Sequence, residues 1–343
     1  MTGRERALNV FQYKECDIPC FDIQEGTVWD SIGYYFRQEH NLETEEDVRN
    51  FLNCDFRWTH LQETGDDPLP RSKDEIVGLL GTNYSDSSGG YLLADAKTVA
   101  DVDRLFAPDP YERPIPDFKA LRQRFPDKAI VFGIEWTPFF SGACSVFGME
   151  KAMILMLTEP EMYHAFAIKQ KEYLCEYIRL SIEAGAAKYC DFFWTGDDFA
   201  SETGLILSPN DWRRLVKPYL SEAFDIVNRA GMHTLFHSCG AVSDVYPDFI
   251  EMGIDSHIGV QTSAKGMEIE RLARDFGGKL VIFGGVDAQT TLISGTPKEV
   301  EEEVKRNLRA FEGCGGYIVS NSHHSLPDLP GGNIYAMARA AGH

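Results

Sequence analysis

The sequence predicts an α/β protein that folds as a closed (β/α)8 TIM barrel, and three observations support this fold class. From residue 129 onward, short apolar runs alternate with longer helical stretches, which is typical of parallel strands joined by helical crossovers. Six such units and room for two more before residue 129 give the eight strands of a barrel. The chain also lacks the G-x-G-x-x-G spacing of an open nucleotide-binding sheet. The barrel is therefore favoured over an open doubly wound sheet.

The predicted strands are short runs rich in apolar, β-branched or aromatic residues. Before residue 129 the two candidate runs are Ile18–Ile23 and Gly90–Leu93. The later runs are Ala129–Ile134, Tyr189–Trp194, His233–Phe236, Ser256–Val260, Leu280–Phe283 and Tyr317–Ser320. Helices are expected between them, and Thr296-Pro297-Lys298-Glu299 has the threonine, proline and glutamate of a capping box.

We expect a single domain over residues 1–343, with residues 1–75 as an N-terminal elaboration packed on the barrel. This first segment is less regular than the rest, although a helix is expected to start at Thr44. No stretch reads as a linker that would divide the chain. With 43% hydrophobic and 12% aromatic residues, the chain can bury a full core.

Composition and charge disfavour several classes of partner. The 33 Lys and Arg residues against 53 Asp and Glu residues give a net charge of −20 without a basic block, which argues against binding to nucleic acids or anionic membranes. The longest apolar stretch, around Ala152–Leu157, is too short to span a bilayer, and the first residues do not resemble a secretory signal. We therefore expect a cytoplasmic protein. Its eight cysteines are too sparse for a disulfide scaffold.

Polar residues follow every mapped strand from residue 129 onward. In a barrel the chemistry is found at the C-terminal strand ends, so these residues are the candidates for function. They are Glu135-Trp136, Gly196-Asp197-Asp198, His237-Ser238-Cys239-Gly240, Gln261, Gly284-Gly285-Val286-Asp287 and Asn321-Ser322-His323-His324. A purely structural barrel would not need such groups after each strand.

His237 and Cys239 place an imidazole and a thiol two residues apart at a strand end, a ligand pair that suits Zn²⁺. Taken alone, such a pair is more often a core cysteine beside a hydrogen-bonded histidine. A third ligand is needed, and the last strand supplies His323 and His324. Cys314 precedes that strand and, at about 3.3 Å per residue, lies roughly 20 Å from the catalytic rim, so it is excluded.

Asp197 and Asp198 are adjacent carboxylates at the predicted barrel mouth. One interpretation is a helix cap with a solvated neighbour. The other is a carboxylate that holds the substrate or acts as an acid, with Asp198 preferred over Asp197. Glu135 follows an apolar strand beside Trp136, so burial would raise its pKa, unless it is simply paired with an arginine.

The order and spacing of several motifs resemble the uroporphyrinogen decarboxylase superfamily from about residue 130 to the end. The motifs are Phe140-Ser141-Gly142-Ala143, Gly196-Asp197-Asp198 with Ser208-Pro209, His237-Ser238-Cys239-Gly240, Gly285-Val286-Asp287 with Gly295-Thr296-Pro297, and Gly316-Tyr317-Ile318-Val319 with Pro327-Asp328 and Asn333-Ile334. The resemblance implies a (β/α)8 barrel. The superfamily includes both that decarboxylase and zinc-dependent methyltransferases of corrinoid pathways.

Two motifs distinguish these branches. The decarboxylase holds its tetrapyrrole with an arginine-rich segment, typically Met-Arg-Gln-Ala-Gly-Arg, and the nearest segment here, Tyr35-Phe36-Arg37-Gln38, lacks the second arginine. The methyltransferase branch carries His-x-Cys-Gly, which is present as residues 237–240. Such methyltransferases usually have a second zinc cysteine after the last strand, where this chain has His323. The decarboxylase also has a histidine there, and the family register favours His323 over His324.

The resemblance therefore implies a zinc-dependent methyltransferase with His237, Cys239 and His323 as metal ligands and with water, Glu135 or substrate in the fourth position. A Cys2His set neutralises Zn²⁺, whereas His2Cys leaves one positive charge and a stronger Lewis acid toward oxygen. We expect O-demethylation of a methyl ether, with an aryl ether as first choice, and transfer of the methyl group to the cobalt(I) of a corrinoid (cobalamin). No corrinoid-binding domain is visible, so a partner corrinoid protein would carry that cofactor.

An apolar substrate pocket near the strand ends is also expected, although ordinary core aromatics are an equally weighted interpretation. The expected substrate contacts are Trp136, Phe139, Phe140, Phe193, Trp194, Gln261 and Asp287. Three alternatives stay open: methyl transfer from a methylcorrinoid to a thiol or tetrahydrofolate-type acceptor, a metal-free decarboxylase using Asp198 and His323, and a non-catalytic binding barrel.

Overall fold

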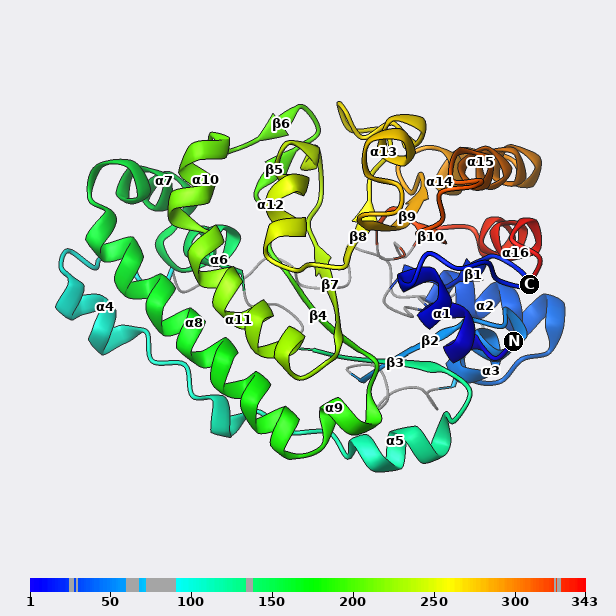
Figure 1. Ribbon diagram of the computed structural model, residues 1–343, viewed down its shortest axis with the longest axis horizontal. Helices are drawn as coiled ribbons and strands as arrows, with labels where there is room; N and C mark the ends of the chain where they lie inside the picture. Colours follow the sequence, from blue (N-terminus) through cyan, green and yellow to red (C-terminus); the bar gives the residue numbers. More distant parts are fainter. Residues whose placement is uncertain are drawn as a thin grey trace.

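The chain forms an eight-stranded parallel sheet that curves into a barrel (Figure 1). The computed structural model describes residues 1–24, 28, 30–59, 68–71, 91–133, 138–323, 325 and 328–343. The sheet order is β1-β10-β9-β8-β7-β4-β3-β2, and every pairing along it is parallel. Its strands are β1 (Cys20–Phe21), β2 (Phe56–Trp58), β3 (Ala129–Gly133), β4 (Phe192–Gly196), β7 (His233–His237), β8 (Ser256–Val260), β9 (Val281–Val286) and β10 (Tyr317–Asn321). The predicted (β/α)8 fold class is confirmed.

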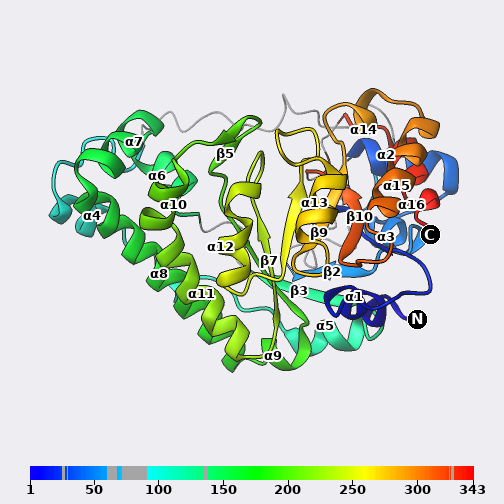
Figure 2. The ribbon, with the colours of Figure 1, turned by 45° about the horizontal axis from the view of Figure 1, so that its top comes forward.

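Helices cover the outside of the barrel, with α8 and α11 side by side on one flank and α15 beside α16 on another (Figures 1 and 2). Capping boxes begin α3 at Thr44 and α15 at Thr296, as the sequence predicts. A short antiparallel hairpin, β5 (Ala200–Ser201) and β6 (Gly204–Leu205), follows β4. The helices are α1 (Gly3–Phe11), α2 (Asp30–His40), α3 (Glu45–Phe51), α4 (Val99–Leu105), α5 (Phe118–Arg124), α6 (Phe140–Phe147), α7 (Met149–Thr158), α8 (Pro160–Glu183), α9 (Ala186–Tyr189), α10 (Pro209–Leu215), α11 (Lys217–Arg229), α12 (Tyr246–Glu251), α13 (Ile269–Phe276), α14 (Thr291–Ser294), α15 (Pro297–Ala310) and α16 (Gly331–Ala340).

The barrel closes where β1 meets β2. The backbone N–H of Asp55 donates to the carbonyl of Phe21 at 2.9 Å, and the Asp55 carboxylate accepts the Phe21 N–H at 3.0 Å. The guanidinium of Arg6 in α1 forms a buried ion pair with that carboxylate. Side-chain contacts therefore hold this seam where the strands are only two and three residues long.

The apolar core has an inner and an outer layer. Alternate residues of the strands fill the barrel interior, as the two-residue period of strands requires. Helix α1 contributes Val10 and Phe11 to this inner cluster, and its Arg4 contacts Asp127 and Asp191, which precede β3 and β4. Helix α1 therefore covers the N-terminal end of the barrel and leaves the C-terminal strand ends for the site. The outer cluster fills the space between strands and helices.

Two expectations about the first third of the chain are corrected by the structure. The second strand is Phe56–Trp58, which pairs with β3 through Phe56 and Ala129, so residues 1–75 contribute this strand to the barrel as well as the one predicted within Ile18–Ile23. The run expected at Gly90–Leu93 is not a strand: Leu93 lies in a turn, and Gly90 is outside the described residues. Strand β2 is hidden in the sequence because Arg57 interrupts its apolar pattern while its guanidinium is buried against Glu46.

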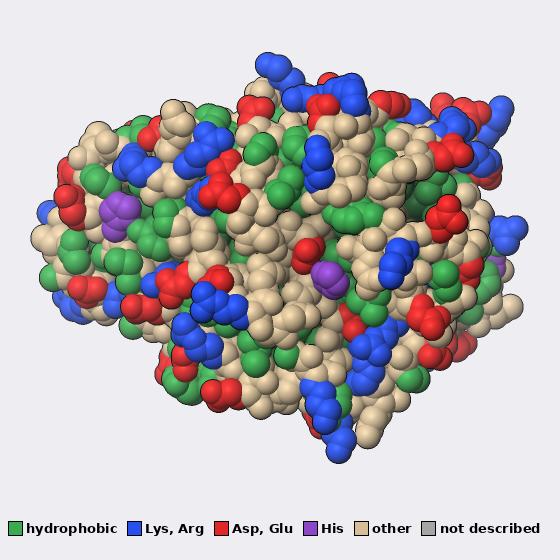
Figure 3. All heavy atoms as spheres, viewed as in Figure 1, with side chains coloured by type: hydrophobic (Ala, Val, Ile, Leu, Met, Phe, Trp, Pro, Cys, Tyr) green, Lys and Arg blue, Asp and Glu red, His purple; other side chains and the backbone are tan. Residues whose placement is uncertain are grey.

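The described surface carries charges of both signs. On the face in Figure 3, Lys and Arg side chains are interspersed with Asp and Glu rather than gathered in one block. Among the helices that the structure describes, no single one is long and apolar enough to cross a membrane. Helices α6 and α7 meet that length and composition only as a pair, across a bend of 118°.

Asp22 makes the stability of this barrel depend on pH. It is fully buried and accepts a hydrogen bond from Nε1 of Trp58 at 2.8 Å, and burial raises the pKa of Asp22 to about 7. In the unfolded chain the pKa is about 3.9, so the folded state binds the proton more tightly between these values. The stabilising contribution of this group is therefore complete below about pH 4 and is lost as the pH rises to about 7.

We expect Asp22→Asn to raise the free energy of unfolding at pH 8 and to change it little at pH 4. Asparagine removes the titration and keeps an oxygen that can accept the Trp58 hydrogen bond. Urea unfolding of both proteins at the two pH values measures this difference. The same change in stability at pH 4 and pH 8 would contradict the explanation.

Candidate metal centre and active site

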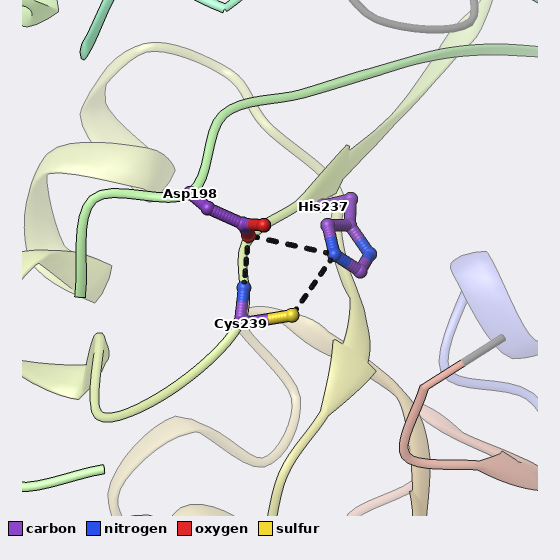
Figure 4. Close-up of side chains that lie close together, drawn as sticks. All are labelled: Asp198, His237 and Cys239. Carbon is purple, nitrogen blue, oxygen red and sulfur yellow. Dashed lines mark hydrogen bonds and ion pairs between the residues drawn. The ribbon is translucent and has the colours of Figure 1, made fainter. Parts of the chain in front are cut away.

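The end of β7 brings His237 and Cys239 together at the C-terminal end of the barrel (Figure 4). The Nε2 atom of His237 lies 3.4 Å from Sγ of Cys239, so the H-x-C spacing does direct both groups to one point. The turn that follows depends on Gly240, whose φ is +84°. A Cβ there would lie 2.6 Å from the carbonyl oxygen of Ser201, so the β5–β6 hairpin can pack against this turn only if residue 240 is glycine.

Strand pairing brings Asp198 to the same point. Gly196 of β4 pairs with His237 of β7, and two residues further along the chain Asp198 accepts the backbone N–H of Cys239 at 2.7 Å. The same oxygen, Oδ1, lies 3.6 Å from Nε2 of His237. One ligand atom from each of Asp198, His237 and Cys239 lies within 4.8 Å of the other two.

The donor set fits a zinc ion. A tetrahedral zinc ion with bonds of about 2.0 Å to nitrogen or oxygen and about 2.3 Å to sulfur separates its ligand atoms by roughly 3.3–3.6 Å. The distances of 3.4 Å and 3.6 Å from Nε2 of His237 match that spacing. Burial lowers the pKa of His237 to about 4, an effect that the Asp198 carboxylate opposes and His323 reinforces. The imidazole is therefore neutral near pH 7, as metal binding requires.

His323 lies beside this cluster. It follows β10, and its ring centroid is 6.4 Å from that of His237, with the ring planes at 75°. Its backbone carbonyl accepts a hydrogen bond from the side-chain amide of Asn321. Asp198, which we expected as an acid or a substrate contact, therefore supplies the third donor atom of the cluster. His323, which we expected as the third ligand, lies next to His237. His324 lies outside the described residues.

Gln24 and His257 support the site and were not found by the sequence analysis. The amide nitrogen Nε2 of Gln24 lies 3.2 Å from Nδ1 of His237. Nδ1 of His257 accepts a hydrogen bond from the Tyr246 hydroxyl at 2.7 Å. Nε2 of the same ring donates a hydrogen bond to the carbonyl of Ser238 at 2.8 Å. The sequence held a signal for Gln24, because it directly follows the predicted strand run Ile18–Ile23, and the other candidates were chosen because they follow a predicted strand.

Asp197 binds the start of α6. Its fully buried carboxylate accepts the backbone N–H groups of Phe139, Phe140 and Ser141, together with the Ser141 hydroxyl, at 2.7–2.9 Å. Burial raises the pKa of Asp197 to about 6, and the four hydrogen bonds act in the opposite direction. Asp197 therefore has the position of a helix cap, and Asp198 is the member of the pair that reaches the cluster.

The expected aromatic pocket is not assembled as predicted. Phe139, Phe140 and Phe193 belong to the outer core and are at most 2% exposed, so they cannot line an open substrate cavity. Among the four of these aromatic residues that the structure describes, Trp194 is the one that points into the barrel, where its ring packs edge-on against Trp58 at 5.8 Å. The two-residue strand period explains why Phe193 and Trp194, which are neighbours in β4, face opposite layers.

The remaining predicted contacts hold loops or lie outside the described residues. The Gln261 side chain accepts the backbone N–H of Gly240 at 3.2 Å. The Asp287 carboxylate caps its own turn and lines a separate surface cavity of about 780 Å³, beside α14 and α15, which none of the three clustered donors lines. Glu135 and Trp136 are among the residues that the structure does not describe.

Comparisons with known proteins agree with this architecture. A family model described as uroporphyrinogen decarboxylase (URO-D) matches residues 78–343. A uroporphyrinogen decarboxylase from Geobacter metallireducens is 30% identical over 259 residues, which cover 70% of this chain and 69% of that protein. One from Geotalea daltonii is 28% identical over 257 residues, with the same coverage of 70% and 69%. A solved structure titled as a methyltransferase from Methanosarcina mazei has a TM-score of 0.67 at 18% identity and covers 100% of this chain and 98% of its own, a likeness of fold.

Gly259 in β8 should control how well His237 binds zinc. Its φ is +78°, and a Cβ there would lie 2.8 Å from both Nε2 of Gln24 and Nδ1 of His237. We expect Gly259→Ala to displace the ring and to weaken zinc binding about 10-fold or more, the usual effect of disturbing the partner of a metal-binding histidine. Competition with a chromophoric chelator measures the affinity.

Gly231→Ala is the matched control, because Gly231 has a φ of +77° and no atom within 4 Å of an added Cβ. Both substitutions should cost about 1–2 kcal/mol of stability through backbone strain. Only Gly259→Ala should reduce zinc affinity, so equal affinities in the two variants would refute this role of Gly259.

Proposed function

The chain belongs to the uroporphyrinogen decarboxylase family, and within it we propose that the protein is a zinc-dependent methyltransferase. The observation that carries this proposal is the meeting of His237, Cys239 and Asp198 at the C-terminal end of the barrel. Their atoms have the chemistry and spacing of a zinc site that keeps a position open for substrate. A methyltransferase from Methanosarcina mazei has the same fold, so the barrel as such is compatible with this chemistry.

In this proposal His237, Cys239 and Asp198 hold the metal. Bound zinc would act as a Lewis acid toward an oxygen atom of the methyl-bearing substrate. The buried His237 presents a neutral imidazole, while Asp198 keeps 40% of its side chain exposed and so leaves one side of the cluster accessible. In this proposal His323, whose ring centroid lies 6.4 Å from that of His237, would exchange a proton with the substrate.

We further propose that the methyl donor is a methyl ether, with an aryl ether as first choice, and that the acceptor is the cobalt(I) of a separate corrinoid protein. With Asp198 as third ligand, one thiolate and one carboxylate balance the two charges of Zn²⁺, so the positive charge expected from a His2Cys set is absent. The preference for oxygen then rests on softness: a single thiolate leaves a harder site than two thiolates would. In this proposal a corrinoid carried by a partner would approach the cluster from the side of Asp198, whose side chain is 40% exposed.

Decarboxylation is the second candidate, because the curated relatives bear that name at 28–30% identity. The chain does not supply the arginines expected for a tetrapyrrole substrate in the segment after β1. No Lys or Arg occurs between residues 20 and 36. Arg37, the first one after that segment, pairs with Glu43 at the end of α2. A decarboxylase would therefore need another way to hold its carboxylates.

We expect the purified protein to hold about one zinc ion per chain and to transfer methyl groups from methoxylated aromatic compounds to a cobalt(I) corrinoid protein. His237→Ala and Cys239→Ser should each lose zinc and reduce transfer at least 100-fold, roughly the loss of 3 kcal/mol of transition-state stabilisation. Metal analysis and the absorbance change from cobalt(I) to methylcobalt(III) measure the two effects.

Cys314→Ser is the matched control, since this half-buried cysteine donates to the carbonyl of Phe311 and is far from the cluster in the predicted register. It should keep both zinc and activity. A zinc-free protein that releases CO2 from uroporphyrinogen, with the His237 and Cys239 variants fully active, would replace the methyltransferase proposal by the decarboxylase.

A further inference from the structure

The imidazole of His237 is held between two different groups. Its Nε2 atom faces the cluster, 3.4 Å from Sγ of Cys239 and 3.6 Å from Oδ1 of Asp198. Its other nitrogen, Nδ1, lies 3.2 Å from the amide nitrogen Nε2 of Gln24. Any change in how Gln24 meets Nδ1 therefore acts on the nitrogen that would bind a metal.

A neutral imidazole carries one proton, and only the nitrogen without it has a lone pair for a metal. Binding through Nε2 of His237 therefore requires the proton on Nδ1, where it needs an acceptor. A half-turn of the Gln24 amide exchanges its nitrogen and oxygen at almost the same place. The structure has the amide nitrogen toward the ring, the orientation that donates to Nδ1 and places the proton on Nε2. After the half-turn the amide oxygen faces the ring and accepts the proton of Nδ1.

The surroundings of Gln24 fix it in this position. Its backbone N–H donates to the side-chain oxygen of Asn321 in β10 at 2.9 Å, and Asn321 in turn donates to the carbonyl of His323. Its side chain is fully buried and lies against Gly259, where a Cβ would come within 2.8 Å of the amide nitrogen. The contact between Gln24 and His237 thus ties β1, β7, β8 and β10 together at the barrel mouth.

We propose that Gln24 is a positioning residue that accepts the Nδ1 proton of His237 and thereby makes Nε2 the zinc-binding nitrogen. Metal-binding histidines commonly donate their second N–H to such an acceptor, which fixes the tautomer and the ring orientation. The inference rests on the proposed function only for the zinc site. The protonation of the ring is measurable without any methyl transfer.

Three variants separate this role from a purely structural one. Gln24→Leu removes the acceptor at similar size, Gln24→Glu keeps an acceptor and removes the donor, and Gln170→Leu changes another buried glutamine, whose amide donates to the carbonyl of Pro138. Zinc affinity is measured by competition with a chromophoric chelator. Gln24→Leu should bind zinc about 10–100-fold more weakly than wild type. Gln24→Glu should stay within a few-fold of wild type, and Gln170→Leu should be unchanged.

The second readout is the ¹⁵N NMR spectrum of the His237 ring, assigned with a His237→Asn variant. Wild-type protein loaded with zinc should show the proton on Nδ1, a result that needs no Gln24 variant to fold. In metal-free protein, Gln24→Leu should shift the ring toward the Nε2–H form, and Gln24→Glu should keep the proton on Nδ1.

Two results would overturn this inference and leave the proposed function intact. One is zinc bound through Nδ1 of His237 in the wild-type protein, and the other is zinc affinity as strong in Gln24→Leu as in wild type. Equal weakening by Gln24→Leu and Gln24→Glu would do the same, because the acceptor would then be irrelevant. If the wild-type protein binds no zinc, the proposed function and this inference fail together.

Discussion

The in-register pairing of Gly196 in β4 with His237 in β7 is the interaction on which the site depends. Because the two strands are parallel and end at the same level, the residues that follow them meet. Asp198 and Cys239 each lie two residues beyond a paired residue, and the carboxylate of one binds the backbone of the other. Asp197, one residue earlier, reaches the start of α6 instead. One strand end thus anchors a helix and supplies a donor atom to the cluster, and a slip of one residue would exchange these roles.

Around the three donors, buried polar groups hold the loops in place without joining the donor cluster. His257 holds the carbonyl of Ser238, Gln261 holds the N–H of Gly240, and Gln24 contacts the far side of His237. Burial costs little where such groups have partners, and satisfied networks of this kind rigidify a site. The same burial keeps His237 neutral. The enclosed imidazole and the partly exposed Asp198 together give a centre that is rigid on one side and open on the other.

The sequence predicts those parts of this architecture that depend on local pattern. Apolar runs locate seven of the eight barrel strands to within a few residues, and the H-x-C spacing is enough to bring His237 and Cys239 together. Contacts set by register or by strand face were not predictable in this way. Strand β2 escaped because Arg57 breaks its pattern, and Phe139 was assigned to a pocket although it faces the outer core. Asp198 was predicted as an acid or a substrate contact, and its place among the donors depends on the pairing of β4 with β7.

X-ray absorption at the zinc edge of the purified protein tests the central claim, a zinc site with one thiolate, most directly. The account predicts one sulfur neighbour at about 2.3 Å and nitrogen or oxygen neighbours at about 2.0–2.2 Å. It also predicts that the sulfur disappears from the spectrum of Cys239→Ser. A zinc ion with two or more sulfur neighbours, or one surrounded only by nitrogen and oxygen in the wild-type protein, would contradict the account.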